Sequence, residues 1–109
     1  MKEKRPVVGG IVSKYADVMV LANEDPYTED PEKIIDEVWA GIDHTKTKAH
    51  RIFDRGQAIK FLLNEAKPDD IVILCGKGSD TTMWVKEGQV PWNERKVTRE
   101  LLRDMAQDL

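Results

Sequence analysis

The sequence has 109 residues, of which 40% are apolar and 34% charged, and this balance fits one modest globular domain. A net charge of −3 gives no electrostatic footprint for nucleic acid, and no apolar run approaches the roughly 20 residues that a membrane-spanning helix needs. A single cysteine, Cys75, excludes an internal disulfide, and no signal-peptide pattern follows the charged start. We therefore expect a cytoplasmic protein that binds neither nucleic acid nor membranes.

The first predicted element is a helix over residues 6–16, which carries an apolar stripe at helical spacing. The stripe consists of Val7, Val8, Ile11, Val12 and Tyr15. Gly9 and Gly10 lie inside this helix, and we expect them to let it pack closely on a sheet. Residues 17–22 follow as a short apolar run, which is typical of a buried strand.

A loop rich in acidic and turn-forming residues follows this strand, over residues 23–30, and a second helix begins behind it. Asp30 is a good N-cap and Pro31 suits the first helical position. Gly41 is expected to close this helix in a left-handed conformation. Because ligands of open α/β sheets bind at the carboxyl ends of strands, the loop is a candidate binding segment.

The second half of the chain repeats the alternation of strand and helix. Residues 49–53 predict a strand, and Asp54 is expected to cap a helix that ends near Lys67, just before a proline. Residues 70–75 are almost wholly apolar, and they give the clearest strand prediction in the chain.

A small hairpin and a final helix complete the predicted elements. Residues 81–85 and 89–92 flank a short turn, and Asn93 is expected to cap a helix that runs to about residue 106. The order of elements predicts an α/β fold: a three-layer, mainly parallel sheet with flanking helices and a small C-terminal hairpin, in a single domain.

Parallel strands would bring two separate loops, residues 23–28 and 76–80, to the same edge of the sheet. In the second loop, Gly76-Lys77-Gly78 can bring backbone N–H groups to an anion, although a tight turn is the simpler interpretation. A set of carboxylates could bind an ammonium group or a divalent cation at this edge, or could serve only in caps and turns, as we expect for Asp30. These carboxylates belong to Glu24, Asp25, Glu29, Asp30 and Asp80.

Neither histidine predicts a metal site. His44 and His50 lack the spacing of metal ligands and have no cysteine nearby, so we expect no resident metal. No combination of serine, cysteine, histidine and acid in the sequence predicts a catalytic nucleophile, and we assign no catalytic residue.

Four segments of the chain match, in order, the motifs of one family. They are Lys4-Arg5-Pro6 with Gly9, Glu24-Asp25-Pro26-Tyr27-Thr28-Glu29-Asp30-Pro31, Asp54-Arg55 followed by Ala58-Ile59, and Gly76-Lys77-Gly78-Ser79-Asp80. They resemble the Lys-Arg-Pro, Asp-Asn-Pro-Arg-x-Glu-x-Pro, Asp-Arg-x-x-Ala-Ile and Gly-Lys-Gly-His-Glu motifs of the Mur ligase C-terminal domain. The resemblance is closest to the tripeptide synthetases of that family, and it runs from about Lys4 to the last helix.

The resemblance implies a Rossmann-like domain of an ATP- and Mg²⁺-dependent amide ligase in peptidoglycan biosynthesis, and thus in cell-wall biogenesis, cell shape and cell division. Such a ligase adds the third residue to UDP-N-acetylmuramoyl dipeptide, through attack of the amino acid's amine on an acyl phosphate. The C-terminal domain closes over a central ATPase domain and presents the amino acid. We therefore expect no ATP or Mg²⁺ to bind this chain alone.

The family's two loop motifs hold the far end of the incoming amino acid. Carried over by position, they imply binding by Asp25, Tyr27, Gly76 and Asp80, with support from Glu24, Lys77 and Ser79. Tyr27 stands where the motif has arginine, and tyrosine cannot form a bidentate ion pair with a carboxylate. Two carboxylates without an arginine favour a lysine- or ornithine-like amino acid over diaminopimelate.

The family's domain starts with two further strands, and its ATPase domain precedes them, so the resemblance implies that residues 1–109 are a partial domain without activity alone. A parallel sheet of three strands would expose apolar edges, from which we hypothesise self-association through edge strands. Two alternatives stay open: a non-catalytic binding module of the same fold, and a domain of another Mur-type ligase such as a folylpolyglutamate or cyanophycin synthetase.

Overall fold

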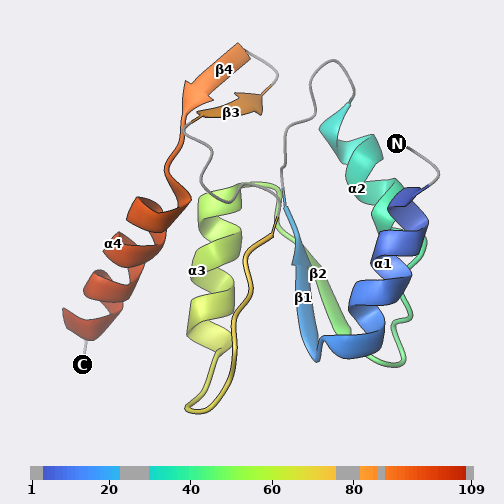
Figure 1. Ribbon diagram of the computed structural model, residues 1–109, viewed down its shortest axis with the longest axis horizontal. Helices are drawn as coiled ribbons and strands as arrows, with labels where there is room; N and C mark the ends of the chain where they lie inside the picture. Colours follow the sequence, from blue (N-terminus) through green and yellow to red (C-terminus); the bar gives the residue numbers. More distant parts are fainter. Residues whose placement is uncertain (1–3, 23–29, 76–81, 86–87, 108–109) are drawn as a thin grey trace.

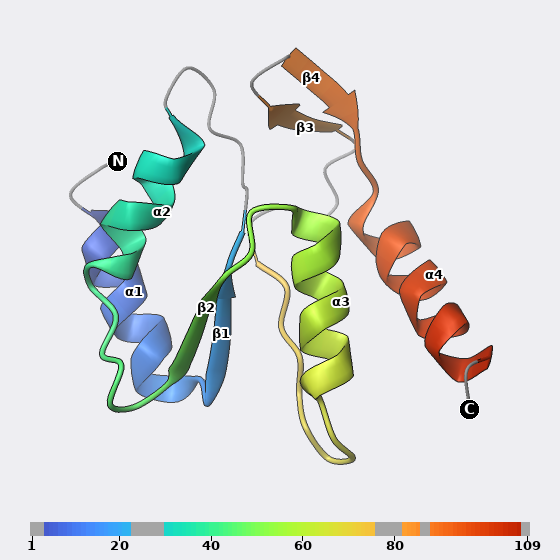
Figure 2. The same ribbon diagram turned by 180° about the vertical axis from the view of Figure 1, so that it is seen from behind.

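The computed structural model describes residues 4–22, 30–75, 82–85 and 88–107, which form helices on both sides of a small sheet (Figures 1 and 2). The elements are α1 (Lys4–Tyr15), β1 (Val18–Leu21), α2 (Pro31–Trp39), β2 (Lys48–Arg51), α3 (Arg55–Glu65), β3 (Thr82–Val85), β4 (Gly88–Pro91) and α4 (Glu94–Gln107). Among these, no helix combines the length and apolar character that crossing a bilayer requires.

The central sheet is formed by β1 and β2, which pair in parallel with Val18 opposite Lys48 and Leu21 opposite Arg51. Helices α1 and α2 lie on one side of it, and α3 and α4 lie on the other (Figure 1). An antiparallel hairpin of β3 and β4 precedes α4. This arrangement confirms the predicted α/β class, the parallel sheet with flanking helices and the C-terminal hairpin.

The buried apolar side chains come from the sheet and from the two helices that follow its strands. They are Met19 of β1, Ile35 of α2, Ile42 just after α2, and Ala58 and Ile59 of α3. Within the sheet, Met19 is buried, the other residues of β1 are half-buried, and Lys48 and Arg51 at the two ends of β2 are exposed.

Residues 71–75 do not form the strand that their sequence predicts. They take part in no sheet with the other described residues, and the side chains of Ile71 and Ile73 are 86% and 73% exposed. The segment runs beside β1 and in the same direction (Figures 1 and 2). The prediction was wrong because an apolar run becomes a strand only when a neighbouring backbone supplies hydrogen bonds and buries it.

Helix α1 packs with a different face from the one that its apolar stripe predicts. The stripe residues Val7, Val8, Ile11, Val12 and Tyr15 are exposed. The buried residues are Gly9 and Ser13, and a Cβ atom on Gly9 would lie 2.2 Å from the carbonyl oxygen of Val38 in α2. The glycine therefore serves close packing on α2, where the sequence predicted packing on the sheet.

A second glycine, Gly41, contributes to the same helix contact. Gly41 does not adopt the left-handed φ that the sequence predicted, so that prediction is wrong, and the C-cap residue Ala40 is right-handed (φ −60°, ψ −23°). A Cβ atom on Gly41 would lie 1.8 Å from the carbonyl oxygen of Pro6 in α1. Only glycine lets the start of α1 approach the end of α2 this closely.

The predicted helix caps are present. The side chain of Asp30 accepts a hydrogen bond from the backbone N–H of Glu32 at 3.0 Å, and Asp54 accepts from Gln57 at 2.9 Å. Asn93 Oδ1 accepts from the N–H of Lys96 at 2.9 Å and starts α4. Each cap satisfies an N–H group that the first turn of its helix leaves unpaired.

Candidate functional site

The residues that the sequence predicts for amino-acid binding all lie outside the described part of the chain. They are Asp25, Tyr27, Gly76 and Asp80, with the supporting Glu24, Lys77 and Ser79. Their positions in the chain follow two described ends, Ala22 behind β1 and Cys75 at the end of the 71–75 segment. The placement of these two ends is what the structure contributes to the site.

The two ends lie at one edge of the sheet. The carbonyl oxygen of Leu21, at the end of β1, accepts a hydrogen bond from the N–H of Ile52 at 3.0 Å, just past the end of β2. Arg55, at the start of α3, donates from Nη2 to the carbonyl oxygen of Cys75 at 2.6 Å. The carboxyl ends of β1, β2 and the 71–75 segment are thus close together, as the sequence predicted for parallel strands.

A buried ion pair supports this edge. Arg55 Nε lies 2.5 Å from Oε1 of Glu94, and Arg55 Nη2 lies 3.1 Å from Oε2 of the same carboxylate. The two residues are only 8% and 5% exposed. The pair joins the first turn of α3 to the first turn of α4, and its parallel bonds are the geometry in which arginine binds carboxylates most strongly.

The sequence predicts no partner for either member of this pair. Arg55 belongs to the motif Asp54-Arg55 with Ala58-Ile59, and Glu94 directly follows the cap residue Asn93. One signal was present, because a cation in the first turn of a helix opposes the helix dipole and requires a compensating group. The identity of that group depends on α4, which lies far away in the sequence.

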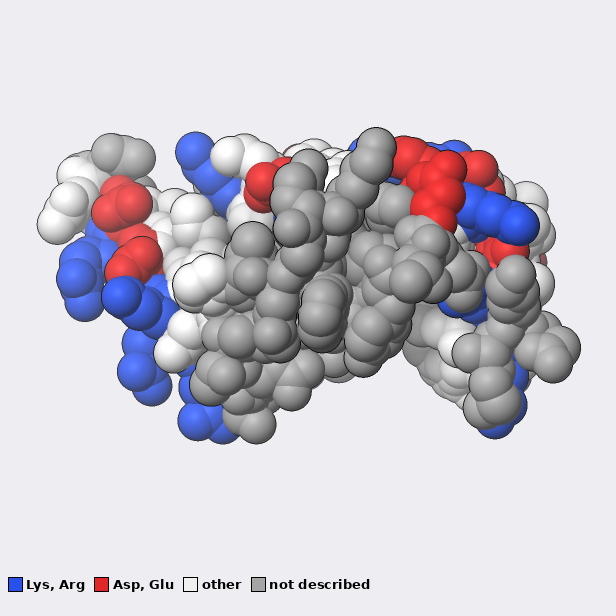
Figure 3. Space-filling view, turned by 90° about the horizontal axis from the view of Figure 1, so that it is seen from above, with Lys and Arg blue, Asp and Glu red and all other residues white. Residues whose placement is uncertain are grey.

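A second group of charges lies on the surface at the end of β2. Arg51 donates to Asp36, its Nη2 lies 3.7 Å from Oε2 of Glu32, and its guanidinium is 5.4 Å from the ring centre of Trp39. Figure 3 shows acidic and basic side chains side by side over this part of the molecule. These side chains are exposed, so their ion pairs contribute little to stability.

Other polar features lie away from this edge. The pKa of Asp43, in the connection before β2, is held below its usual value by hydrogen bonds from the hydroxyl and then the backbone amide of Thr45. The His, Cys, Asp and Glu side chains of the described ranges form no group of three or more that could hold a metal ion.

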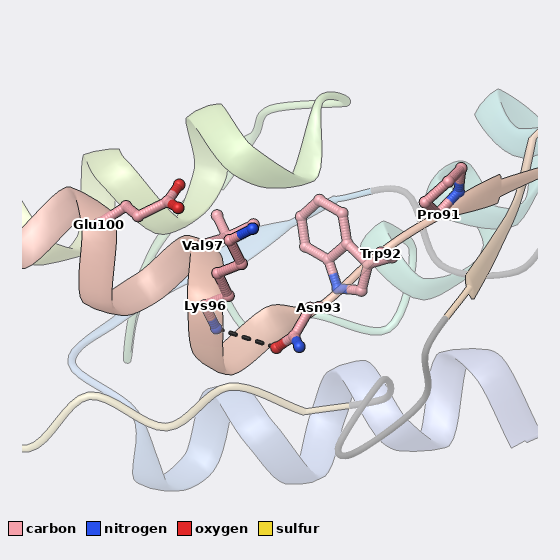
Figure 4. Close-up of a pocket in the computed structure, with 6 residues that line it drawn as sticks. All are labelled: Pro91, Trp92, Asn93, Lys96, Val97 and Glu100. Carbon is pink, nitrogen blue, oxygen red and sulfur yellow. Dashed lines mark hydrogen bonds between the residues drawn. The ribbon is translucent and has the colours of Figure 1, made fainter.

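An open groove of about 450 Å³ lies where the hairpin meets α4 (Figure 4). It is lined by Pro91, Trp92, Asn93, Lys96, Val97 and Glu100.

Comparison with known proteins identifies a family. The sequence profile described as "Mur ligase, glutamate ligase domain" matches residues 1–78. The chain is 37% identical over 103 residues to the UDP-N-acetylmuramoyl-L-alanyl-D-glutamate–2,6-diaminopimelate ligase of Caldanaerobacter subterraneus, which covers 94% of this chain and 21% of that protein. The corresponding enzyme of Clostridioides difficile is 39% identical, and the match again covers 94% of this chain and 21% of that protein.

Two further relatives agree. The UDP-N-acetylmuramyl-tripeptide synthetase of Lacticaseibacillus paracasei is 37% identical over 82% of this chain and 17% of its own length. A solved structure of a UDP-N-acetylmuramoyl-L-alanyl-D-glutamate–2,6-diaminopimelate ligase matches 97% of this chain and 22% of its own with a TM-score of 0.89 and 29% identity. The chain spans about a fifth of the length of these relatives. It belongs to the Mur ligase family and corresponds to the family's C-terminal, Rossmann-like glutamate ligase domain.

Proposed function

We propose that this chain is the amino-acid-presenting domain of an ATP- and Mg²⁺-dependent ligase that adds the third residue to UDP-N-acetylmuramoyl dipeptide in peptidoglycan synthesis. The observation that carries the proposal is the shared edge, where the contact of Arg55 with the Cys75 carbonyl brings the end of the 71–75 segment to the ends of β1 and β2. Both family-like loop motifs follow directly from that edge. The names of the relatives, a diaminopimelate ligase and a tripeptide synthetase, support the same reaction class.

In this proposal the chain itself performs no chemistry. Asp25, Tyr27, Gly76 and Asp80 bind the distal end of the amino acid, and they hold its amine toward a reaction centre in the ATPase domain. ATP and Mg²⁺ are bound by that other part of the ligase, where they activate the acceptor carboxylate. Because the chain spans about a fifth of its relatives, we propose that it shows no ligase activity alone.

The proposed substrate is a lysine- or ornithine-like amino acid. The distal group of such a substrate is an ammonium, which pairs with the carboxylates of Asp25 and Asp80. Diaminopimelate carries an additional distal carboxylate, and Tyr27 offers it a single hydroxyl in place of the motif's guanidinium.

An assay of the complete ligase that contains this domain tests the proposal. The wild type should have a KM for lysine or ornithine at least about tenfold below that for diaminopimelate, since a hydrogen bond to a charged group contributes about 1.5–3 kcal/mol. Tyr27→Arg should shift the preference toward diaminopimelate. Tyr15→Arg, at an exposed position of α1, is the matched control and should leave the preference unchanged. If the wild type prefers diaminopimelate, the proposed lysine- or ornithine-like substrate is wrong. If the isolated chain turns over substrate, the proposal that it has no ligase activity alone is wrong.

We also propose that the isolated chain self-associates through its exposed edge. Among the described residues, the 71–75 segment belongs to no sheet, and its Ile71 and Ile73 side chains are exposed, which makes this edge a template for pairing with another chain. Light scattering should show a dimer at micromolar concentrations, and Ile73→Lys should shift it to a monomer. Leu102→Lys, at an exposed position of α4, should leave the dimer intact. A wild-type chain that stays monomeric at every concentration contradicts this proposal.

A further inference from the structure

We propose that Arg55 and Glu94 form a clamp that fixes the carbonyl group of Cys75, which directly precedes the Gly76-Lys77-Gly78-Ser79-Asp80 motif in the chain, and that amino-acid binding depends on this clamp. The positioning role deepens the proposed function and rests on it. The clamp itself is a statement about described atoms, and it can be tested on this chain without any substrate. Arg55 is a positioning residue in this proposal, because it acts through Cys75 and the backbone that follows.

The geometry of the guanidinium makes the contact directional. Arg55 Nε and Nη2 bind the two oxygens of Glu94 at 2.5 and 3.1 Å, and Nη2 also donates to the carbonyl oxygen of Cys75 at 2.6 Å. A planar guanidinium held at two points by one carboxylate cannot turn without breaking one of those bonds. The bond to Cys75 therefore has a fixed direction as well as a fixed length.

The 71–75 segment depends on this contact. It belongs to no strand ladder among the described residues, and its preceding turn is closed by the hydrogen bond from the N–H of Asp70 to the carbonyl oxygen of Lys67. At its other end, Arg55 donates a hydrogen bond to the carbonyl oxygen of Cys75. Because no ladder holds the segment, the bond at Cys75 fixes the position of its carboxyl end.

The buried ion pair holds the donor in place. Arg55 and Glu94 are 8% and 5% exposed, and the bond from Arg55 to Cys75 is partly buried. A hydrogen bond from a charged donor is stronger than one between neutral groups. Lysine at position 55 keeps the charge and can pair with Glu94, but its single ammonium cannot reproduce the fork that reaches both partners.

The chain contains a matched control and a ready-made probe. Arg51 is also an arginine at the sheet edge, but it forms ion pairs with Asp36 and Glu32, which are exposed residues of α2. Cys75 is the only cysteine of the sequence, and its side chain is exposed, so a nitroxide spin label can be attached there without any further substitution.

The first experiment measures the electron paramagnetic resonance spectrum of the isolated chain labelled at Cys75. Arg55→Lys should narrow the spectrum, because the backbone under the label loses its tie, and Glu94→Gln should do so to a smaller extent. Arg51→Lys should leave the spectrum unchanged. Circular dichroism checks that each variant keeps its helices. An Arg55→Lys spectrum identical to that of the wild type, in a folded chain, overturns the clamp.

The second experiment measures steady-state kinetics of the complete ligase. Arg55→Lys should raise the KM for the amino acid about tenfold while the KM for ATP and kcat change by less than about twofold, and Arg51→Lys should change none of them. If Arg55→Lys narrows the spectrum of the label but leaves the KM for the amino acid unchanged, the positioning role is wrong and the contact is only structural. If the wild-type ligase accepts no amino acid, the proposed function and the positioning role are both wrong. The spectra of the labelled chain still test whether Arg55 and Glu94 hold Cys75.

Discussion

Glu94→Ala should lower the free energy of unfolding by about 3–5 kcal/mol, which is the cost of leaving one partner of a buried ion pair without the other. The guanidinium of Arg55 would stay buried beside an apolar side chain, and among the described residues it would keep its hydrogen bond to the carbonyl group of Cys75. A single domain is typically stable by about 5–15 kcal/mol, so this loss is a large part of the total. Urea unfolding followed by circular dichroism measures it.

Two further variants separate the buried charge from other effects. Asp36→Ala removes a partner of Arg51 on the surface and should cost less than about 1 kcal/mol, because exposed ion pairs are screened by water. The double variant Arg55→Met with Glu94→Leu should recover most of the stability that either single change removes, since an apolar pair needs no compensating charge. A loss below about 1 kcal/mol for Glu94→Ala would mean that water reaches the pair, contrary to its burial.

Gly9→Ala and Gly41→Ala should each destabilise the chain by about 3 kcal/mol, at the upper end of the range for overpacking. The new methyl groups would lie 2.2 Å from the carbonyl oxygen of Val38 and 1.8 Å from that of Pro6. Both clashes involve backbone atoms, which cannot move aside as a flexible side chain can. The helices α1 and α2 would have to separate, and thermal unfolding would report the loss.

Gly56→Ala is the matched control for these two variants. Among the described residues, a Cβ atom at Gly56 would meet only the Oδ1 atom of Asp54 at 3.3 Å, and the position lies in helix α3. The alanine gains up to about 1 kcal/mol of helix propensity, so this variant should be close to neutral or slightly stabilised. Equal losses at Gly9, Gly41 and Gly56 would show that the close approach of α1 and α2 is not the cause.

The candidate site was predictable from the sequence only as two loops, because motifs identify residue types but give no distances. Alternation of strands and helices predicted that residues 23–28 and 76–80 follow one edge of the sheet. The contact from Arg55 to the Cys75 carbonyl supports that placement. The roles of Asp25, Tyr27, Gly76 and Asp80 stay predictions, since these residues lie outside the described part of the chain.

Local chemistry determined the elements that the sequence alone could predict. The caps at Asp30, Asp54 and Asn93, the hairpin of β3 and β4, and the strand β1 depend on neighbouring residues or on a short apolar run. The motifs were sufficient to indicate the family. These features are encoded within short stretches, where spacing and turn chemistry decide the outcome.

Tertiary structure alone decided which apolar surfaces are used and which charges meet. Residues 71–75 have the composition of a strand, but a strand also needs a hydrogen-bonded partner, and the segment forms no ladder with any described strand. The apolar stripe of α1 is exposed because Gly9 and Gly41 admit a closer contact on another face. Arg55 and Glu94 meet across 39 residues. Hydrogen bonding between strands, close packing and buried charge pairing all require groups that are distant in sequence, so no local pattern could reveal them.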